Sequence, residues 1–281
     1  MKVIAHLSDL HFGRIDPAVV HGLLVELVVA PPDLVVISGD LVQRAQRRHF
    51  LAARAFLEQL PVPYLVVPGN HDLPVYNLLA RFTHPWRNYT RYISRDFSPF
   101  HVDEEMAVLG LNTARKFILD FTRGRINQAQ IARIHEVFDP LPPRLFRIVF
   151  THHPFIPPAD HPDAPLVGRA QKALPVLEAC GVDLMLAGHL HRAYTGDLQH
   201  HYVRSLRSIL VAQASTATST RTRAEPNAYN RITLAQGTVR IAVRAWDGGS
   251  FATVADTGFV RDDGRWRVQP VTATPVAPSA R

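Results

Sequence analysis

The chain has 281 residues, of which 47% are hydrophobic and 20% are charged, and its 31 basic and 24 acidic residues give a net charge of +7. This hydrophobic content is enough for a buried core and excludes a wholly disordered protein, and the length fits one large α/β domain or two small ones. The positive charge suits an anionic substrate, nucleic acid or a membrane surface, although the arginines are spread along the chain and form no basic tract.

The N-terminal stretch MKVIAHLSD contains too few apolar residues for the core of a signal peptide. No apolar run approaches the length of about 20 residues that a membrane-spanning helix needs. A cytoplasmic location is therefore expected. The single cysteine, Cys180, excludes an internal disulfide, and its setting in VLEACGVDLML predicts a buried helix end.

Short apolar runs rich in β-branched residues recur along the first two thirds of the chain, and segments with helical periodicity lie between several of them. The predicted strands are residues 3–7, 34–38, 64–67, 107–111, 146–151 and 183–187. The predicted helices are residues 17–29, 47–60, 128–138 and 168–179. This alternation is typical of βαβ units with parallel strands.

From about residue 202 the pattern changes to strands without helices, in SILVAQAS, NRITLAQGTVRIAVRAW and SFATVAD. No linker rich in Gly, Ser or Pro divides the chain, so residues 1–268 are expected to form one domain. Residues 269–281 lack aromatics and periodicity and are expected to be disordered. A parallel first half and an antiparallel second half fit two facing sheets with helices outside.

Reactive polar residues follow five of the predicted strands. They are Asp9 and His11 in SDLHFG, Asp40 in SGDL, Asn70 and His71 in PGNHD, His152 in THHP, and His189 and His191 in AGHLH. Open α/β sheets form their ligand sites at the carboxyl ends of the strands, so these side chains are expected to meet at one edge. Residues two apart in an extended segment also project to the same side, so each of the pairs in SDLHFG and AGHLH is expected to face one point.

The donor atoms in this set are carboxylate and amide oxygens and imidazole nitrogens, with no thiolate, which suits zinc, iron or manganese better than calcium or an iron–sulfur cluster. Two aspartates, one asparagine and, without His71, four histidines exceed what one catalytic ion needs and fit two ions that share a bridging carboxylate. The alternative of ordinary turn aspartates and loop histidines suits any one of these residues alone but not the whole set. The histidines without such a setting are expected to be structural or exposed: His21, His49, His84, His135, His200 and His201.

The ordered motifs D-x-H, G-D, G-N-H-D, H-H and G-H-x-H, from Asp9 to His191, resemble the signature of the calcineurin-like metallophosphoesterases. Within that superfamily the compact size is most similar to the bacterial cyclic-nucleotide phosphodiesterase branch. The resemblance implies a four-layer α/β/β/α sandwich with two facing mixed sheets and a binuclear metal centre that hydrolyses phosphate esters. It implies one ion held by Asp9, His11, Asp40 and His191, and a second held by Asp40, Asn70, His152 and His189, with Asp40 bridging.

The resemblance also implies that His71 lies near the scissile phosphate without binding metal and that Asp72 orients it. Two manganese, iron or zinc ions are then expected to hold a bridging hydroxide that attacks phosphorus. In this mechanism His71 stabilises developing charge or protonates the leaving alkoxide. No competing nucleophile motif is present, and the G-x-S-x-G and P-loop patterns are both missing from the sequence.

Two further segments have alternative interpretations. Residues 84–96, HPWRNYTRYISRD, place Arg87, Arg91 and Arg95 at four-residue steps among aromatics. If helical, this segment either contacts a nucleotide, nucleic acid or membrane surface, or presents a solvated face with half-buried aromatics, which is favoured. The proline-rich residues 155–168 either cover the site or only connect two elements.

The favoured function is hydrolysis of a small anionic phosphodiester, such as a cyclic nucleotide, by an enzyme of unknown oligomeric state. The basic charge keeps a nuclease as an alternative, and residues 84–96 keep a nucleotide-linked lipid pyrophosphatase. A non-catalytic protein-binding scaffold is disfavoured because no motif is lost. The only additional cationic residues near the motifs are Arg14 and Arg192. A monoester dianion commonly needs more cationic donors than this, so a diester is the favoured substrate.

Overall fold

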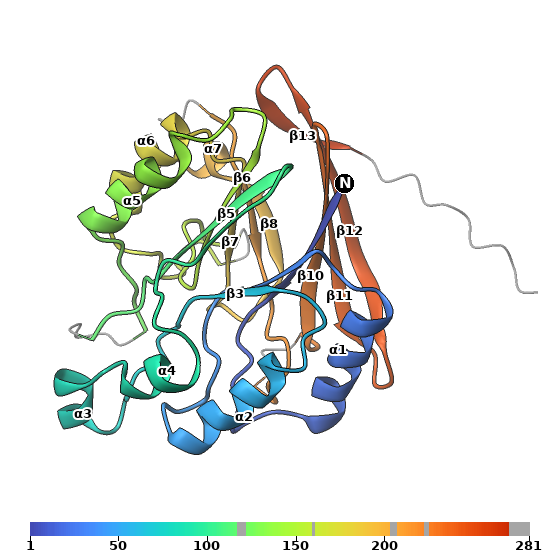
Figure 1. The fold of residues 1–281 in the computed structure, drawn as a ribbon. Coiled ribbons are helices and arrows are strands. Elements are labelled where there is room, and N and C mark those ends of the chain that lie inside the picture. Colours follow the sequence, from blue (N-terminus) through green and yellow to red (C-terminus); the bar gives the residue numbers. More distant parts are fainter. Residues whose placement is uncertain (117–121, 159–160, 203–206, 222–224, 270–281) are drawn as a thin grey trace, which may run out of the picture.

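The computed structural model describes residues 1–116, 122–158, 161–202, 207–221 and 225–269. Two mixed β-sheets face each other, and helices cover their outer faces (Figure 1). The tail that was predicted from residue 269 lies outside the described residues, apart from Gln269, which ends the last strand.

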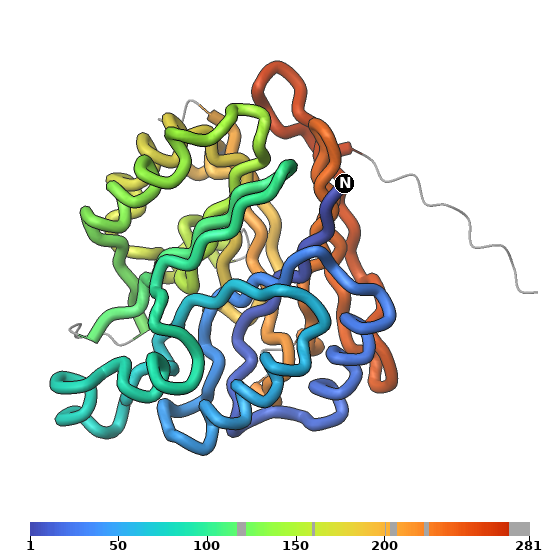
Figure 2. Tube along the Cα trace, in the orientation of Figure 1, coloured from blue at the N-terminus to red at the C-terminus, as the bar shows by residue number. Residues whose placement is uncertain are grey.

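The first sheet joins the two ends of the chain. Its strand order is β13-β12-β11-β10-β1-β2-β3, and only β1, β2 and β3 run parallel to one another. Figure 2 shows the blue N-terminal strand beside the orange C-terminal strands, and Ile4 pairs with Ile232 in this antiparallel contact. The strands are β1 (Lys2–Leu7), β2 (Leu34–Ile37), β3 (Tyr64–Val66), β10 (Ala228–Ala235), β11 (Thr238–Trp246), β12 (Phe251–Asp262) and β13 (Arg265–Gln269).

The second sheet has the order β4-β5-β6-β7-β9-β8, with four parallel central strands and an antiparallel strand at each edge. Its strands are β4 (Phe100–Val102), β5 (Met106–Leu111), β6 (Phe146–Thr151), β7 (Leu184–Ala187), β8 (Tyr194–Asp197) and β9 (Leu210–Gln213). The short edge strands β4 and β8 were not expected from the sequence.

The helices connect the strands and pack on the outer faces of the sheets (Figure 1). They are α1 (Pro17–Val29), α2 (Arg47–Leu57), α3 (Leu78–Thr83), α4 (Arg87–Tyr92), α5 (Gln128–Phe138), α6 (Ala170–Ala179) and α7 (Leu198–His201). Local signals fix several of their starts. Asp16 caps α1 ahead of Pro17, and Asn127 with Gln130 forms a capping box at α5.

Alternation of side chains along the strands produces three buried layers. On β1, Ala5 and Leu7 belong to the layer under α1 and α2, whereas Ile4 belongs to the layer between the two sheets. The third layer packs α5 and α6 against the second sheet. Central strands are buried on both faces, which is why β2 (LVVI) and β5 (MAVLGL) are almost continuously apolar. The four-layer α/β/β/α sandwich expected from the sequence is confirmed.

The segment of residues 84–96 contains one short helix, α4, and its rings point inward. Tyr89 is fully buried, Trp86 and Tyr92 pack against the layer under α1 and α2, and Arg87 and Arg91 are exposed. The preferred interpretation, a solvated basic face over half-buried aromatics, agrees with this packing. No helix among the described residues is long and apolar enough to cross a membrane.

Candidate functional site

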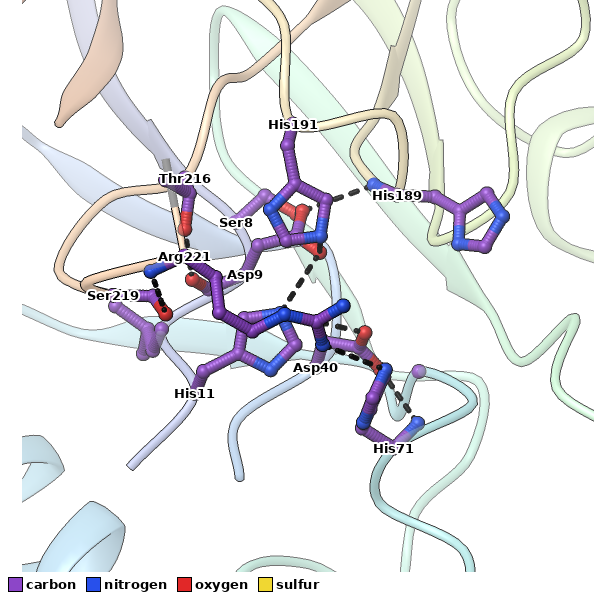
Figure 3. Close-up of polar contacts among 12 residues, drawn as sticks. Ser8, Asp9, His11, Asp40, His71, His189, His191, Thr216, Ser219 and Arg221 are labelled. Carbon is purple, nitrogen blue, oxygen red and sulfur yellow. Dashed lines mark hydrogen bonds and ion pairs between the residues drawn. The ribbon is translucent and has the colours of Figure 1, made fainter. Parts of the chain in front are cut away.

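The sequence motifs converge where the carboxyl ends of strands from both sheets meet. Loops after β1, β2 and β3 bring Asp9, Asp40 and Asn70, and loops after β6 and β7 bring His152 and His189. The contact between the two sheets includes a hydrogen bond from the His189 backbone N–H to Asp9 Oδ2, at 2.9 Å (Figure 3). The expectation of one shared edge therefore holds across two sheets.

One group of donor atoms surrounds Asp9. Its Oδ1 lies 3.6 Å from His11 Nε2 and 3.4 Å from His191 Nε2, and the two imidazole rings stack with centroids 5.2 Å apart. Ser8 Oγ donates a 2.6 Å hydrogen bond to the other carboxylate oxygen of Asp9, which leaves Oδ1 to face the histidines. Asp9 and His11 are completely buried.

A second group surrounds His152. Its Nε2 lies 3.1 Å from Asn70 Oδ1 and 3.5 Å from Asp40 Oδ1, and its ring is 5.1 Å from the ring of His189. His152 Nδ1 lies 2.7 Å from the carbonyl oxygen of Ser38. This nitrogen therefore carries a proton and donates a hydrogen bond to that oxygen. Such a bond fixes the tautomer and points the lone pair of Nε2 into the site.

The Asp40 carboxylate lies between the two groups. Its Oδ1 faces His152 at 3.5 Å, and its Oδ2 faces His11 at 3.8 Å. Burial alone raises the pKa of Asp40, but the electrostatic effect of the neighbouring His152 and His71 and a hydrogen bond with His152 outweigh burial and hold the pKa well below its ordinary value. Asp40 is therefore an anion with one oxygen directed at each group.

The backbone that presents these side chains differs from the extended segments expected from the sequence. Five residues adopt left-handed φ angles, namely Asp9 (52°), His11 (51°), Asp40 (52°), His189 (75°) and His191 (58°). Because this conformation is unfavourable for residues other than glycine, its concentration here marks a strained, functional region. The expectation that His189 and His191 face one point was wrong, since their rings lie in different groups (Figure 3).

The two groups fit metal ions. Asp9 Oδ1 and both ring nitrogens of His11 are buried and have no hydrogen-bond partner among the described residues. Burial lowers the pKa of His11 to about 4 and that of His189 to about 3, so both imidazoles are neutral at pH 7. Unpaired buried donors of this kind are costly unless a cation binds them, and nitrogen and oxygen donors of this set suit a transition metal.

His71 lies at the rim of the site. Its Nδ1 is 3.0 Å from the carbonyl oxygen of Gln43 and donates to it, so Nε2 faces the site, 3.4 Å from Arg221 Nη1 (Figure 3). The backbone N–H of His71 donates to Asp40 Oδ1 at 2.8 Å. This bond connects the histidine to the carboxylate between the two groups.

The expected contact of Asp72 with the His71 ring was wrong. The Asp72 carboxylate accepts hydrogen bonds from the backbone N–H groups of Leu41, Val42 and Gly69, at 3.3, 3.0 and 2.8 Å. It therefore joins the loops after β2 and β3, and Gln43 sets the tautomer of His71 instead. Burial and the charge of Asp40 raise the pKa of Asp72 to about 7, and the three backbone bonds oppose the rise.

Sequence reasoning missed the loop that follows β9. Thr216 Oγ1 and Thr218 Oγ1 each donate a 2.7 Å hydrogen bond, to the carbonyl oxygens of Asp9 and Leu10 respectively. These bonds hold the strained D-x-H loop, and the same segment places Arg221 beside His71. The run STATSTR was a signal, because hydroxyl side chains commonly satisfy backbone groups of neighbouring loops.

His153 was also missed, although the H-H motif contains it. Its buried ring lies 4.7 Å from that of His189, and its Nδ1 lies 2.8 Å from Thr113 Oγ1. Its Nε2 has no hydrogen-bond partner among the described residues. His49, which was expected to be structural or exposed, is buried and forms part of a cleft beside His71.

Two motif glycines allow the loops to approach each other. A Cβ atom on Gly69 would lie 2.2 Å from Asp40 Oδ1, and one on Gly188 would lie 1.8 Å from Ser8 Oγ. Neither distance is possible for a real side chain. The glycine of G-N-H-D is therefore needed for the close approach of the loops after β2 and β3, and the glycine of G-H-x-H for the close approach of the two sheets.

Comparisons with known proteins agree with this geometry. The family model of the calcineurin-like phosphoesterases matches residues 2–193. A probable glycerophosphodiester phosphodiesterase, GpdQ, from Arcobacter nitrofigilis is 24% identical over 211 residues, which are 69% of this chain and 73% of that protein.

Two solved structures share the fold. Yellow lupin (Lupinus luteus) purple acid phosphatase PPD1 has a TM-score of 0.71 at 12% identity, over 93% of this chain and 54% of that one, so the present chain spans about half its length. A dimetal phosphatase from Danio rerio has a TM-score of 0.62 at 13% identity, over 90% of this chain and 98% of that one. With the family model matched over most of the chain and the motif residues gathered at one site, the chain belongs to the calcineurin-like phosphoesterase family, as its motifs indicated.

Proposed function

We propose that this phosphoesterase hydrolyses phosphodiesters at a binuclear metal centre. The observation that supports this most strongly is the position of Asp40, whose two oxygens face different groups of buried donors. A carboxylate in this position is the ligand that two adjacent ions would share. In this proposal Asp9, His11, Asp40 and His191 hold one ion, and Asp40, Asn70, His152 and His189 hold the other.

Bound ions of this kind supply an activated water and draw charge from the phosphoryl oxygens. Protonation of the leaving group and stabilisation of the developing charge are then carried out by residues at the rim of the site. In the imidazolium form, His71 keeps its Nδ1 proton on the Gln43 carbonyl and directs its Nε2 proton into the site, where it protonates the leaving oxygen. The Arg221 guanidinium, next to that nitrogen, binds a phosphoryl oxygen and stabilises the charge that develops there.

The preference for diesters is supported by the name of a curated relative, a probable glycerophosphodiester phosphodiesterase. Cyclic nucleotides are the alternative small diesters, as the motif resemblance suggested. Arg221 Nη1 lies 3.4 Å from His71 Nε2 and is the guanidinium that this proposal places on the scissile phosphate, and one guanidinium suits the single charge of a diester.

The test is a comparison of kcat/KM for bis(p-nitrophenyl) phosphate and p-nitrophenyl phosphate, with manganese, iron or zinc added to chelator-treated protein. We expect the diester to be the better substrate and activity to return only with metal. Glycerophosphocholine, 3′,5′-cyclic AMP, a nucleotide-linked lipid and duplex DNA then separate the proposed classes. A monoester preference would reject the proposal, and cleavage of DNA alone would favour a nuclease.

A further inference from the structure

A cleft beside His71 contains three arginines, in addition to Arg221, that hydrolysis of a simple diester does not need. Its volume is about 450 Å³, and its lining includes Arg14, Arg44, Arg48 and Arg221 together with His71. The arginines come from three separate parts of the chain: the loop after β1, the start of α2 and the loop after β9. The tertiary fold thus assembles a cationic cleft that no single segment contains.

These arginines have no acidic partners in the part of the chain that the structure describes. The lining of the cleft contains no carboxylate, and none of the four guanidinium groups forms an ion pair. Arginines elsewhere on the surface do pair, as Arg54 does with Glu58 and Arg240 with Asp256. Four like charges around one cleft repel one another, and a bound anion would relieve that repulsion.

Neutral contacts hold two of these side chains in place. The Arg44 guanidinium lies over the ring of Tyr76, 5.0 Å from its centroid, and Arg48 Nε donates a 3.1 Å hydrogen bond to Gln46 Oε1. Contacts of this type orient a guanidinium but leave its charge available to a ligand.

The cleft is continuous with the candidate metal site and with a larger groove. His71 and Arg221 line it on the side of the metal site, at 3.4 Å from each other. At its other side it shares Arg44 and Tyr76 with a groove of about 740 Å³, to which Arg47, Arg87 and Arg91 also contribute. A substrate with its scissile phosphate beside His71 would therefore lie close to several arginines of the cleft and the groove.

We propose that the cleft is a second anion subsite, which binds a further phosphate group of the substrate. The inference rests on the proposed phosphodiesterase function. Guanidinium groups bind phosphate through paired N–H donors, and the volume of the cleft is that of a small-molecule site, within roughly 300 to 1,000 Å³. The substrate class is a small phosphodiester that carries a second, non-scissile phosphate.

The test uses two substrates that differ by one phosphate: thymidine 5′-(p-nitrophenyl phosphate) and the same ester with an added 3′-phosphate. In the manganese-loaded protein we expect kcat/KM to be about tenfold or more higher for the ester with the added phosphate, because that phosphate makes an additional charge-assisted contact. The ratio should fall toward one in Arg48→Gln and further in a double variant with Arg44→Gln. Arg95→Gln, which removes an exposed arginine that lines neither cleft, should keep the wild-type ratio.

Binding without turnover separates this inference from the proposed function. Calorimetry should show thymidine 3′,5′-bisphosphate binding more tightly than thymidine 5′-monophosphate, with the difference reduced in Arg48→Gln. If neither ester is hydrolysed but this binding difference is present, the subsite stands and the proposed function fails. If both esters are hydrolysed with equal efficiency, or the ratio is the same in the double variant, the subsite is rejected. Faster cleavage of duplex DNA than of the bisphosphate ester would also reject a small-molecule subsite.

Discussion

His71 shows how the neighbours of one side chain define its chemical role. The Gln43 carbonyl fixes its Nδ1 proton, and the 2.8 Å bond from its backbone to Asp40 fixes its position relative to both donor groups. Its ring packs edge-on against the ring of His11, with centroids 4.9 Å apart, and its Nε2 lies 3.4 Å from Arg221 Nη1. Its role is therefore expected to be in proton transfer and not in metal binding.

Substitution His71→Ala should keep both metal ions but lower kcat by about 10² to 10⁴, which is typical of a positioned acid or base. The loss should be larger for a poor leaving group, such as an aliphatic alcohol, than for p-nitrophenolate. Steady-state kinetics with both substrates and elemental analysis check this. His21→Ala, on the exposed side of α1, serves as the control and should behave like the wild type. Equal turnover of the aliphatic ester by His71→Ala would remove the histidine from the mechanism.

Substitutions of Asp40 and of His189 test which residues bind each metal ion. If Asp40 is shared, Asp40→Ala weakens both ion sites, and elemental analysis should show much less than one ion per chain after dialysis. His189→Ala removes a ligand of one ion only, so about one ion should remain. Identical metal contents in the two variants would contradict a bridging role for Asp40. Circular dichroism establishes that both variants are folded.

At the scale of elements, the site depends on loops that connect two sheets. The loops after β1 and β7 approach so closely that Gly188 has no room for a Cβ atom, and the loop after β9 holds the D-x-H segment through Thr216 and Thr218. The left-handed residues Asp9 and His11 remain in their strained conformations because these contacts fix them. A change at a residue that supplies no donor atom itself can therefore disrupt the site.

Gly188→Ala should lower metal content and activity together, because a methyl group 1.8 Å from Ser8 Oγ forces Ser8 or the loop to move. Ser8 also donates to Asp9, so the displacement reaches a proposed ligand. Metal titration followed by calorimetry and thermal melting measures both effects. Gly249→Ala is the matched control, since its Cβ would meet only Asp247 at 3.9 Å, an ordinary contact. Normal metal affinity in Gly188→Ala would show that the loop approach is not needed.

At the scale of the whole molecule, the buried interior contains histidines whose protonation opposes folding. His6, in β1, is completely buried, with its Nε2 2.9 Å from Ser38 Oγ and its Nδ1 3.3 Å from Asn230 Nδ2. Burial lowers the pKa of His6 to about 3, from an ordinary value of 6.5. The folded protein therefore binds fewer protons than the unfolded chain between these two values.

The stabilising effect of a neutral His6 is fully present above pH 6.5 and is lost as the pH falls toward 3. This single group lowers the free energy of unfolding by up to about 1.4 kcal/mol for each pH unit in that range. Urea unfolding at pH 7, 6 and 5 should show this loss, and His6→Gln should show a weaker pH dependence. The exposed His21→Gln should keep the wild-type dependence. An unchanged slope in His6→Gln would mean that another group controls the pH response.

The sequence by itself determined the order of the main elements, the two-sheet architecture and the set of candidate donor residues. Apolar runs such as LVVI predict strands with two buried faces. The G-N-H-D and G-H-x-H motifs are contiguous in the sequence, and their glycines allow close loop contacts. Only the tertiary structure decided which atoms face one another. The partner of Asp72, the ring directions of His189 and His191 and the position of Arg221 depend on left-handed turns and on contacts between segments up to about two hundred residues apart. Short-range sequence patterns do not predict such contacts, because each of these residue types can pair with many different partners in a folded protein.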